Sequence, residues 1–123
     1  MKPVKTAVGA WLKIVLGAEI AMGPGKADLL DHIIATGSIA AAGRRMKMSY
    51  RRAWLLVDEM NHMFKSPVVT TAKGGKGGGG GAVLTPLGRD VLSRYRNMQA
   101  ATEKAIAGDL KVLKNALAAK RRA

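Results

Sequence analysis

The sequence SIAAAGRRMKMSYRRAWLLVDEMNHMF, residues 38–64, carries two helix-start signals. Ser38 and Ser49 each precede apolar residues at helical spacing, and a serine in this position accepts a hydrogen bond from the first turn of a helix. The spacing predicts helices over residues 38–46 and 49–64, joined by a short connector. Two short helices joined in this way form a helix-turn-helix unit, whose second helix usually enters the major groove of DNA.

The second helix is predicted to have a core face and a solvent face, with Trp54 at the edge between them. Arg51 and Arg52 fall in its first turn, and arginine pairs with guanine more often than any other residue does. Leu55 points outward beside Arg51, which fits contact with a thymine methyl group. The predicted core face consists of Ala53, Leu56, Val57, Met60 and Phe64, and the opposite face of Arg51, Leu55, Asp58 and His62.

Two further elements are predicted before residue 38. Residues 26–36 form an amphipathic helix that ends at Gly37, and Asp28 and Asp31 lie in its first turns, where acidic groups suit the helix dipole. Apolar residues alternate over residues 10–17, which predicts a half-buried strand. We expect this strand to pair near the two strands described next.

Two short β-branched runs, residues 68–72 and 82–85, flank the sequence KGGKGGGGG. They predict a β-hairpin, or wing, over residues 68–85 with a glycine-rich basic tip, and a plain linker is the alternative. Gly77 follows Lys76 where a Walker-type phosphate loop needs Ser or Thr, so nucleotide binding is not expected. Glycine lets a backbone approach phosphates closely. The tip residues expected to do so are Lys73, Gly74, Gly75 and Lys76.

A long helix over residues 87–119 is predicted to begin after Thr85 and Pro86. A helix of this length projects beyond a small domain, and its apolar row needs a partner. We expect that partner to be a second copy of the chain. The expected dimer contacts are Val91, Leu92, Tyr95, Met98, Ile106 and Leu113.

The charge balance points to a polyanionic partner. The 123 residues include 21 Lys and Arg against 8 Asp and Glu, a formal net charge of +13. There are no cysteines, so disulfides, cysteine-ligated metals and thiol nucleophiles are excluded. His32 and His62 lie on different helices without carboxylates in register, and neighbouring Asp58 and Glu59 point apart, so neither a metal site nor an enzyme is expected.

No membrane span is expected, because no apolar stretch approaches the roughly 20 residues that cross a bilayer. Lys13 and Glu19 interrupt the apolar run near the N-terminus, which argues against a secretory signal. We therefore expect a cytoplasmic, nucleoid-associated protein.

The segments GSIAAAGRRMKMSYRRAWLLVDEMN and KGGKGGGGGAVLT resemble the N-terminal winged-helix domain of the ModE-type molybdate-responsive repressors, which is related to the LysR-type helix-turn-helix. The resemblance implies a mainly α fold with a small β component. It also implies a dimeric DNA-binding domain with a wing and a long linking helix. We predict the DNA-binding domain over residues 1–85 and a dimerisation helix with a basic tail over residues 86–123. The residues that the resemblance places at DNA are Ser38, Ser49, Tyr50, Arg51, Arg52, Lys73, Gly74, Gly75 and Lys76.

The expected function is that of a sequence-specific regulator that binds double-stranded DNA as a dimer on a palindromic operator. Arg44, Arg45 and Lys47 are expected to neutralise phosphates. Full-length relatives carry C-terminal molybdate-binding domains, so no cofactor, neither molybdate nor tungstate, and no small-molecule substrate are expected here. The alternatives are a non-specific architectural DNA-binding protein and a protein-interaction module of a molybdenum-related system.

Overall fold

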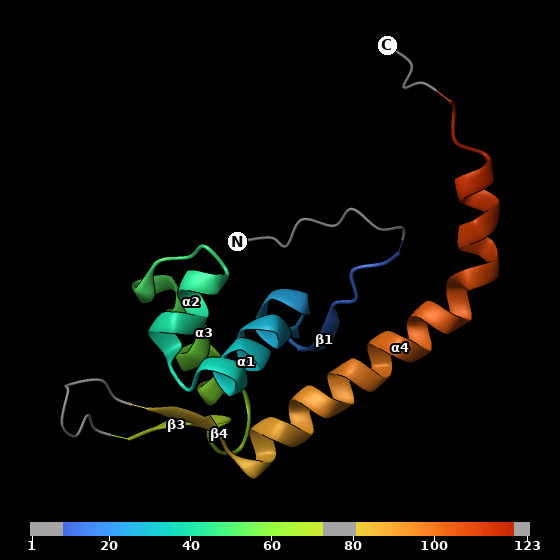
Figure 1. Ribbon diagram of the computed structural model, residues 1–123. Coiled ribbons are helices and arrows are strands. Elements are labelled where there is room, and N and C mark those ends of the chain that lie inside the picture. The colour runs from blue at the N-terminus through green and yellow to red at the C-terminus, as the bar shows by residue number, and fades with distance from the viewer. Residues whose placement is uncertain (1–8, 73–80, 120–123) are drawn as a thin grey trace.

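The computed structural model describes residues 9–72 and 81–119, which form four helices and two small antiparallel sheets. Helices α1–α3 make a body, the β3–β4 hairpin extends from one side of it, and α4 runs away on the other side (Figure 1). This mostly helical architecture confirms the expected fold class at that level. The elements are β1 (Ile14–Gly17), β2 (Ile20–Met22), α1 (Pro24–Thr36), α2 (Ile39–Arg45), α3 (Tyr50–Met63), β3 (Val69–Thr71), β4 (Ala82–Leu84) and α4 (Pro86–Asn115).

The core lies among α1, α2 and α3, and the predicted core face of α3 is confirmed. Leu56 and Phe64 are partly buried and pack against the core, as does Trp54, while Arg51 and Leu55 are exposed. The spacing that defined this face is that of an ideal helix, so the pattern translates directly into burial. The fully or almost fully buried side chains of these helices include Leu29, Leu30, Ile33, Ile39, Ala42, Ala53, Val57 and Met60.

Side-chain caps fix where three helices begin, as predicted. The hydroxyl oxygen of Ser38 accepts a hydrogen bond from the Ala41 amide at 3.1 Å, and that of Ser49 accepts one from the Arg52 amide at 3.0 Å. Thr85 caps α4 in the same way. These bonds satisfy amides that have no partner within the helix, which defines the start of each helix.

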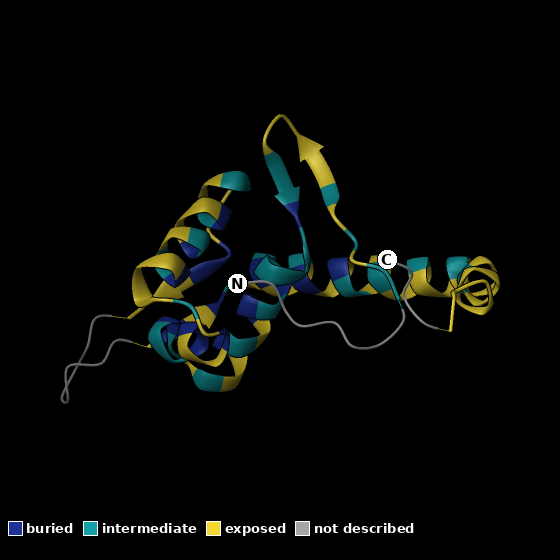
Figure 2. Ribbon diagram, turned by 90° about the horizontal axis from the view of Figure 1, so that it is seen from above, coloured by how far each residue is buried: buried dark blue, intermediate teal, exposed yellow. Residues whose placement is uncertain are grey.

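The N-terminal strand differs from its prediction in length and in partner. It covers Ile14–Gly17 rather than residues 10–17, and it pairs with β2, not with β3 or β4. Glu19, with a φ of 57°, makes the reverse turn between β1 and β2. The predicted alternation holds from Trp11 to Val15, where Leu12 and Ile14 are half-buried. It fails at Leu16, which is 53% exposed because the end of the hairpin stands away from the body (Figure 2).

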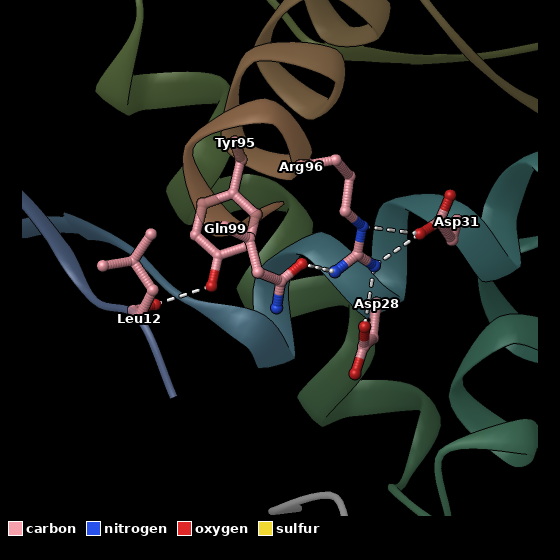
Figure 3. Close-up of polar contacts among 6 residues, drawn as sticks. All are labelled: Leu12, Asp28, Asp31, Tyr95, Arg96 and Gln99. Carbon is pink, nitrogen blue, oxygen red and sulfur yellow. Dashed lines mark hydrogen bonds and ion pairs between the residues drawn. The ribbon is translucent and has the colours of Figure 1, made fainter. Parts of the chain in front are cut away.

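The start of α1 also differs from its prediction. The helix begins at Pro24 instead of residue 26, because proline fits the first helical position, where no amide hydrogen is needed. Asp28 and Asp31 therefore lie beyond the first turn. Their carboxylates instead accept hydrogen bonds from Arg96 of α4 (Figure 3).

The two predicted strands around the glycine-rich segment are confirmed as an antiparallel pair, with Val69 opposite Leu84 and Thr71 opposite Ala82. A β-carbon on Gly88 would lie 2.1 Å from the Val68 carbonyl oxygen, so only glycine allows α4 to start against this hairpin. Residues 73–80, with the predicted tip, lie outside the described residues.

Helix α4 ends at Asn115 rather than at residue 119, and the basic tail at residues 120–123 lies outside the described residues. Two of the expected dimer contacts, Leu92 and Tyr95, are buried in the core of their own chain. Amphipathic spacing cannot distinguish a face that packs on its own domain from a face that packs on a second copy. Of the other expected contacts, Val91 and Ile106 are partly buried, and Met98 and Leu113 are exposed.

Candidate nucleic-acid interface

Helices α2 and α3 cross at very short distance. A β-carbon on Gly43 would lie 2.9 Å from the β-carbon of Ala53, and the Gly43 carbonyl accepts a hydrogen bond from the Met48 amide at 3.0 Å. Lys47 adopts a φ of 56° in the connector between the two helices. The crossing and the connector together hold the first turn of α3 in one orientation relative to α2.

Five cations gather on this connected pair of helix ends. Each is exposed, and none of them forms an ion pair with a carboxylate of residues 9–72 or 81–119. Other cations of the same chain, such as Lys26 and Arg96, do pair with carboxylates. Unpaired exposed cations keep their full attraction for a polyanion, because no intramolecular partner offsets it. The five are Arg44, Arg45, Lys47, Arg51 and Arg52.

The charge changes sign along α3. Its first turn carries Arg51 and Arg52, whereas its second half carries Asp58 and Glu59 on exposed positions. Asp58 lies 3.5 Å from His62, and Glu59 lies 2.8 Å from the ammonium of Lys26. The region suited to a phosphate backbone is therefore limited to the N-terminal part of this helix.

The remaining predicted residues near this surface have local roles as well. The hydroxyls of Ser38 and Ser49 are engaged as helix caps. Tyr50 is exposed, and its hydroxyl accepts a hydrogen bond from the indole N–H of Trp54, whose ring meets it edge-on. Leu55 is 53% exposed on the same face as Arg51, as predicted.

The base of the β3–β4 hairpin is attached to α3 by a residue that the sequence did not single out. The side-chain oxygen of Asn61 accepts hydrogen bonds from the amides of Val68 and Val69 at 2.9 and 3.0 Å, and its nitrogen donates to the Val69 carbonyl at 3.0 Å. The predicted tip residues Lys73, Gly74, Gly75 and Lys76 lie outside the described residues.

The described part of the chain holds no metal-ligand cluster and no membrane-spanning helix. Within it, no group of three or more His, Cys, Asp or Glu residues could hold a metal ion. None of the helices there is long and apolar enough to cross a membrane. What the described residues do bring together is a basic, exposed pair of helix ends, while the small hairpin is attached near the other end of α3, through Asn61.

The geometry of the described residues defines a mostly helical protein with a cluster of exposed, unpaired cations. Comparisons with known proteins add sequence relatives to this description. No family model matches the chain. It is 45% identical over 83 residues to the molybdenum-pterin-binding protein MopB of Rhodobacter capsulatus, which covers 68% of this chain and 30% of MopB. It is 36% identical over 94 residues to the DNA-binding transcriptional dual regulator ModE of Escherichia coli, covering 76% of this chain and 36% of ModE.

A third relative, the molybdenum transport protein ModE of Herbaspirillum seropedicae, is 39% identical over 71 residues. These similarities support the resemblance to ModE proteins over about 70% of the chain. The chain spans about a third of the length of the curated relatives that it matches. The relatives are named as regulators, transport proteins or molybdenum-binding proteins, and none of these names denotes an enzyme.

Proposed function

We propose that the chain is a sequence-specific, double-stranded-DNA-binding transcriptional regulator with a winged helix-turn-helix. The observation that carries this proposal is the cluster of five exposed, unpaired cations on α2, its connector and the first turn of α3. α2 and α3 are the helix pair, α3 is the recognition helix, and β3–β4 is the base of the wing. The DNA-binding domain ends near Thr85, where α4 begins.

Each part of the surface has a distinct task in this proposal. Arg51 and Arg52 contact base edges in the major groove, because a guanidinium can pair with guanine through two hydrogen bonds. Arg44, Arg45 and Lys47 neutralise phosphates and set the register, as do Lys73 and Lys76 with the glycines between them. Binding then weakens steeply with salt, because each phosphate contact releases counterions.

The proposal includes a homodimer formed through α4. Leu92 and Tyr95 are committed to their own core, so the proposed contact consists of the residues that stay accessible, namely Met98, Ile106 and Leu113, with Val91 at its edge. A two-fold dimer presents two recognition helices to one face of the duplex, which favours a palindromic site. A regulator of this kind acts in the cytoplasm, on the nucleoid.

Selection of bound sequences from a pool of random duplexes tests this function. The expected result is one enriched, two-fold symmetric sequence whose half-sites lie about one DNA turn, ~34 Å, or a multiple of it apart. Tight binding without enrichment would replace the proposal with a non-specific architectural protein. Failure to bind any duplex at low salt would favour a protein-interaction module instead.

A second candidate function is binding of a molybdenum compound, which the names of the Mop relatives favour. Calorimetry of the full chain with molybdate and with tungstate separates the two functions. The first proposal expects no heat beyond that of dilution and no change in DNA affinity. Saturable binding would assign an effector to this chain.

A further inference from the structure

Helix α4 leaves the helical body at a single place. Tyr95 is its last buried residue, and along the rest of α4, to Asn115, no side chain is buried. Figure 2 shows this distal part extending beyond the body with exposed and partly exposed residues on all sides. The direction in which α4 projects is therefore set by the packing of Gly88, Leu92 and Tyr95 and by the polar contacts beside Tyr95. Further along, Gly9 lies beside Glu103 and Ala107, but no side chain there is buried.

Beside Tyr95, Arg96 donates a fork of hydrogen bonds to α1 (Figure 3). One terminal nitrogen lies 2.8 Å from a carboxylate oxygen of Asp28, and the Nε atom lies 3.2 Å from one of Asp31. The other terminal nitrogen donates to the side-chain oxygen of Gln99 at 3.0 Å. Beside this fork, the Tyr95 hydroxyl donates to the Leu12 carbonyl at 2.6 Å. All three guanidinium nitrogens are thus engaged at the point where α4 departs.

The hydrogen bonds from Arg96 to Asp28 and Asp31, here called the Arg96 clamp, are more shielded from solvent than an ordinary surface ion pair. The Arg96 side chain is only 32% exposed, and Asp28 is similarly shielded. Burial lowers the pKa of Arg96, but the hydrogen bonds to Asp28 and Asp31 and the negative charges of these carboxylates together raise the pKa above its ordinary value. Partly buried, multiply bonded guanidinium–carboxylate pairs hold a defined geometry, which a single ammonium cannot do.

We propose that Arg96 is a positioning residue that sets the separation of the two DNA half-sites. This inference rests on the proposed function, because it needs two copies joined through the distal part of α4. At 1.5 Å per residue, the segment from Gln99 to Asn115 is about 24 Å long. A change of about 20° at the clamp would displace its far end by about 8 Å, which corresponds to about two base pairs at 3.4 Å each.

Arg94 provides a matched control. It lies on the same helix and pairs with Asp90 at 3.2 Å, but both partners belong to α4 and are exposed. Its loss removes the same charge and the same kind of bond without releasing α4 from α1. Any difference between the two variants therefore reports the link between the helices and not the net charge.

The test uses the full chain and the half-site enriched from the random pool. Duplexes carry two such half-sites with centre-to-centre separations varied in single base-pair steps, and one duplex carries a single half-site. The wild type and Arg94→Gln are expected to prefer one separation at least about tenfold over separations changed by two base pairs. Arg96→Gln is expected to reduce that preference to less than about threefold, with affinity for the single half-site within about twofold of wild type.

Arg96→Lys guards against a merely unfolded variant, because it keeps the charge but loses the fork. It is expected to melt close to wild type and to show a reduced separation preference. A folded Arg96→Gln or Arg96→Lys protein that keeps the wild-type preference for one half-site separation would overturn the inference. A wild type that binds all separations equally well would overturn it too. If the wild type binds no duplex at all, the proposed function itself fails.

Discussion

Gly43 of α2 faces Ala53 of α3 so closely that a β-carbon at position 43 would lie 2.9 Å from that of Ala53. The neighbour is a β-carbon fixed to a helix backbone, so it cannot move aside without shifting α3. We expect Gly43→Ala to lower the free energy of unfolding by about 1–3 kcal/mol, the usual effect of overpacking. Thermal denaturation measures this change. Gly108→Ala is the control, since nothing lies within 4 Å of that site and alanine is expected to stabilise the helix by up to about 1 kcal/mol.

Asn61 supplies the partner for two buried backbone amides at the base of the β3–β4 hairpin. Asn61→Ala leaves both amides without an acceptor, and we expect a loss of about 1–3 kcal/mol in stability. Hydrogen exchange should also show faster exchange at Val68 and Val69. Asn61→Asp keeps the acceptor oxygen and is expected to lose less stability than Asn61→Ala. Asn97→Ala, on an exposed position of α4, is expected to change neither the stability nor the exchange at the two valines. Unchanged exchange at the two valines would contradict the assignment.

Arg51 and Arg52 are expected to determine sequence preference. Arg51→Ala and Arg52→Ala should each cost about 1–3 kcal/mol on the selected operator and relax its preference at the contacted base pair. Competition gel shifts with operator and random duplexes measure both effects. Arg89→Ala removes an exposed cation from the first turns of α4 and serves as the control. An unchanged ratio of operator to random affinity would show that these arginines do not read bases.

Lys47 is expected to act on phosphates and not on bases. Lys47→Gln should weaken binding to all duplexes by a similar factor. It should also reduce the slope of log affinity against log salt concentration by about 1. Titrations at several salt concentrations give this slope. Lys111→Gln, near the far end of α4, is expected to leave the slope unchanged. A loss confined to the operator would assign Lys47 a base contact instead.

The distal part of α4 is expected to hold two copies together. The wild type should sediment as a dimer of the 13.0 kDa chain at tens of micromolar. Leu113→Glu places a charge in the proposed contact and should yield monomers, whereas Val83→Glu changes an equally exposed apolar residue on β4 and should not. A monomeric wild type would refute the proposed dimer.

Local chemistry made much of this fold predictable. The caps at Ser38, Ser49 and Thr85 depend on residues within three positions of one another, and the core face of α3 depends only on helical spacing. The exposed cations on α2 and α3 were predicted for the same reason, since their exposure follows from which side of the helix is apolar.

Contacts between distant residues were not predictable in this way. The sequence suggests that Asp28 and Asp31 interact with the dipole of their own helix. In the structure they accept hydrogen bonds from Arg96, which is 65 or more positions away. The β1–β2 turn places Glu19, not glycine or asparagine, at positive φ, so it carries none of the residues that usually mark a hairpin. Asn61 bonds backbone amides that any residue type would offer, and only the packed hairpin reveals its role.

The reversal of charge along α3 has a consequence for how much DNA one copy of the proposed regulator can inspect. If α3 lay flat along the groove, Asp58 and Glu59 would approach the phosphates and be repelled, so we expect the N-terminal end of α3 to enter the groove first. The end of a helix contacts only a few base pairs, and so short a DNA sequence recurs by chance throughout any genome. Recognition of a single genomic site would then require two such helix ends at a fixed separation. The length and direction of α4 would therefore contribute to sequence recognition together with Arg51 and Arg52.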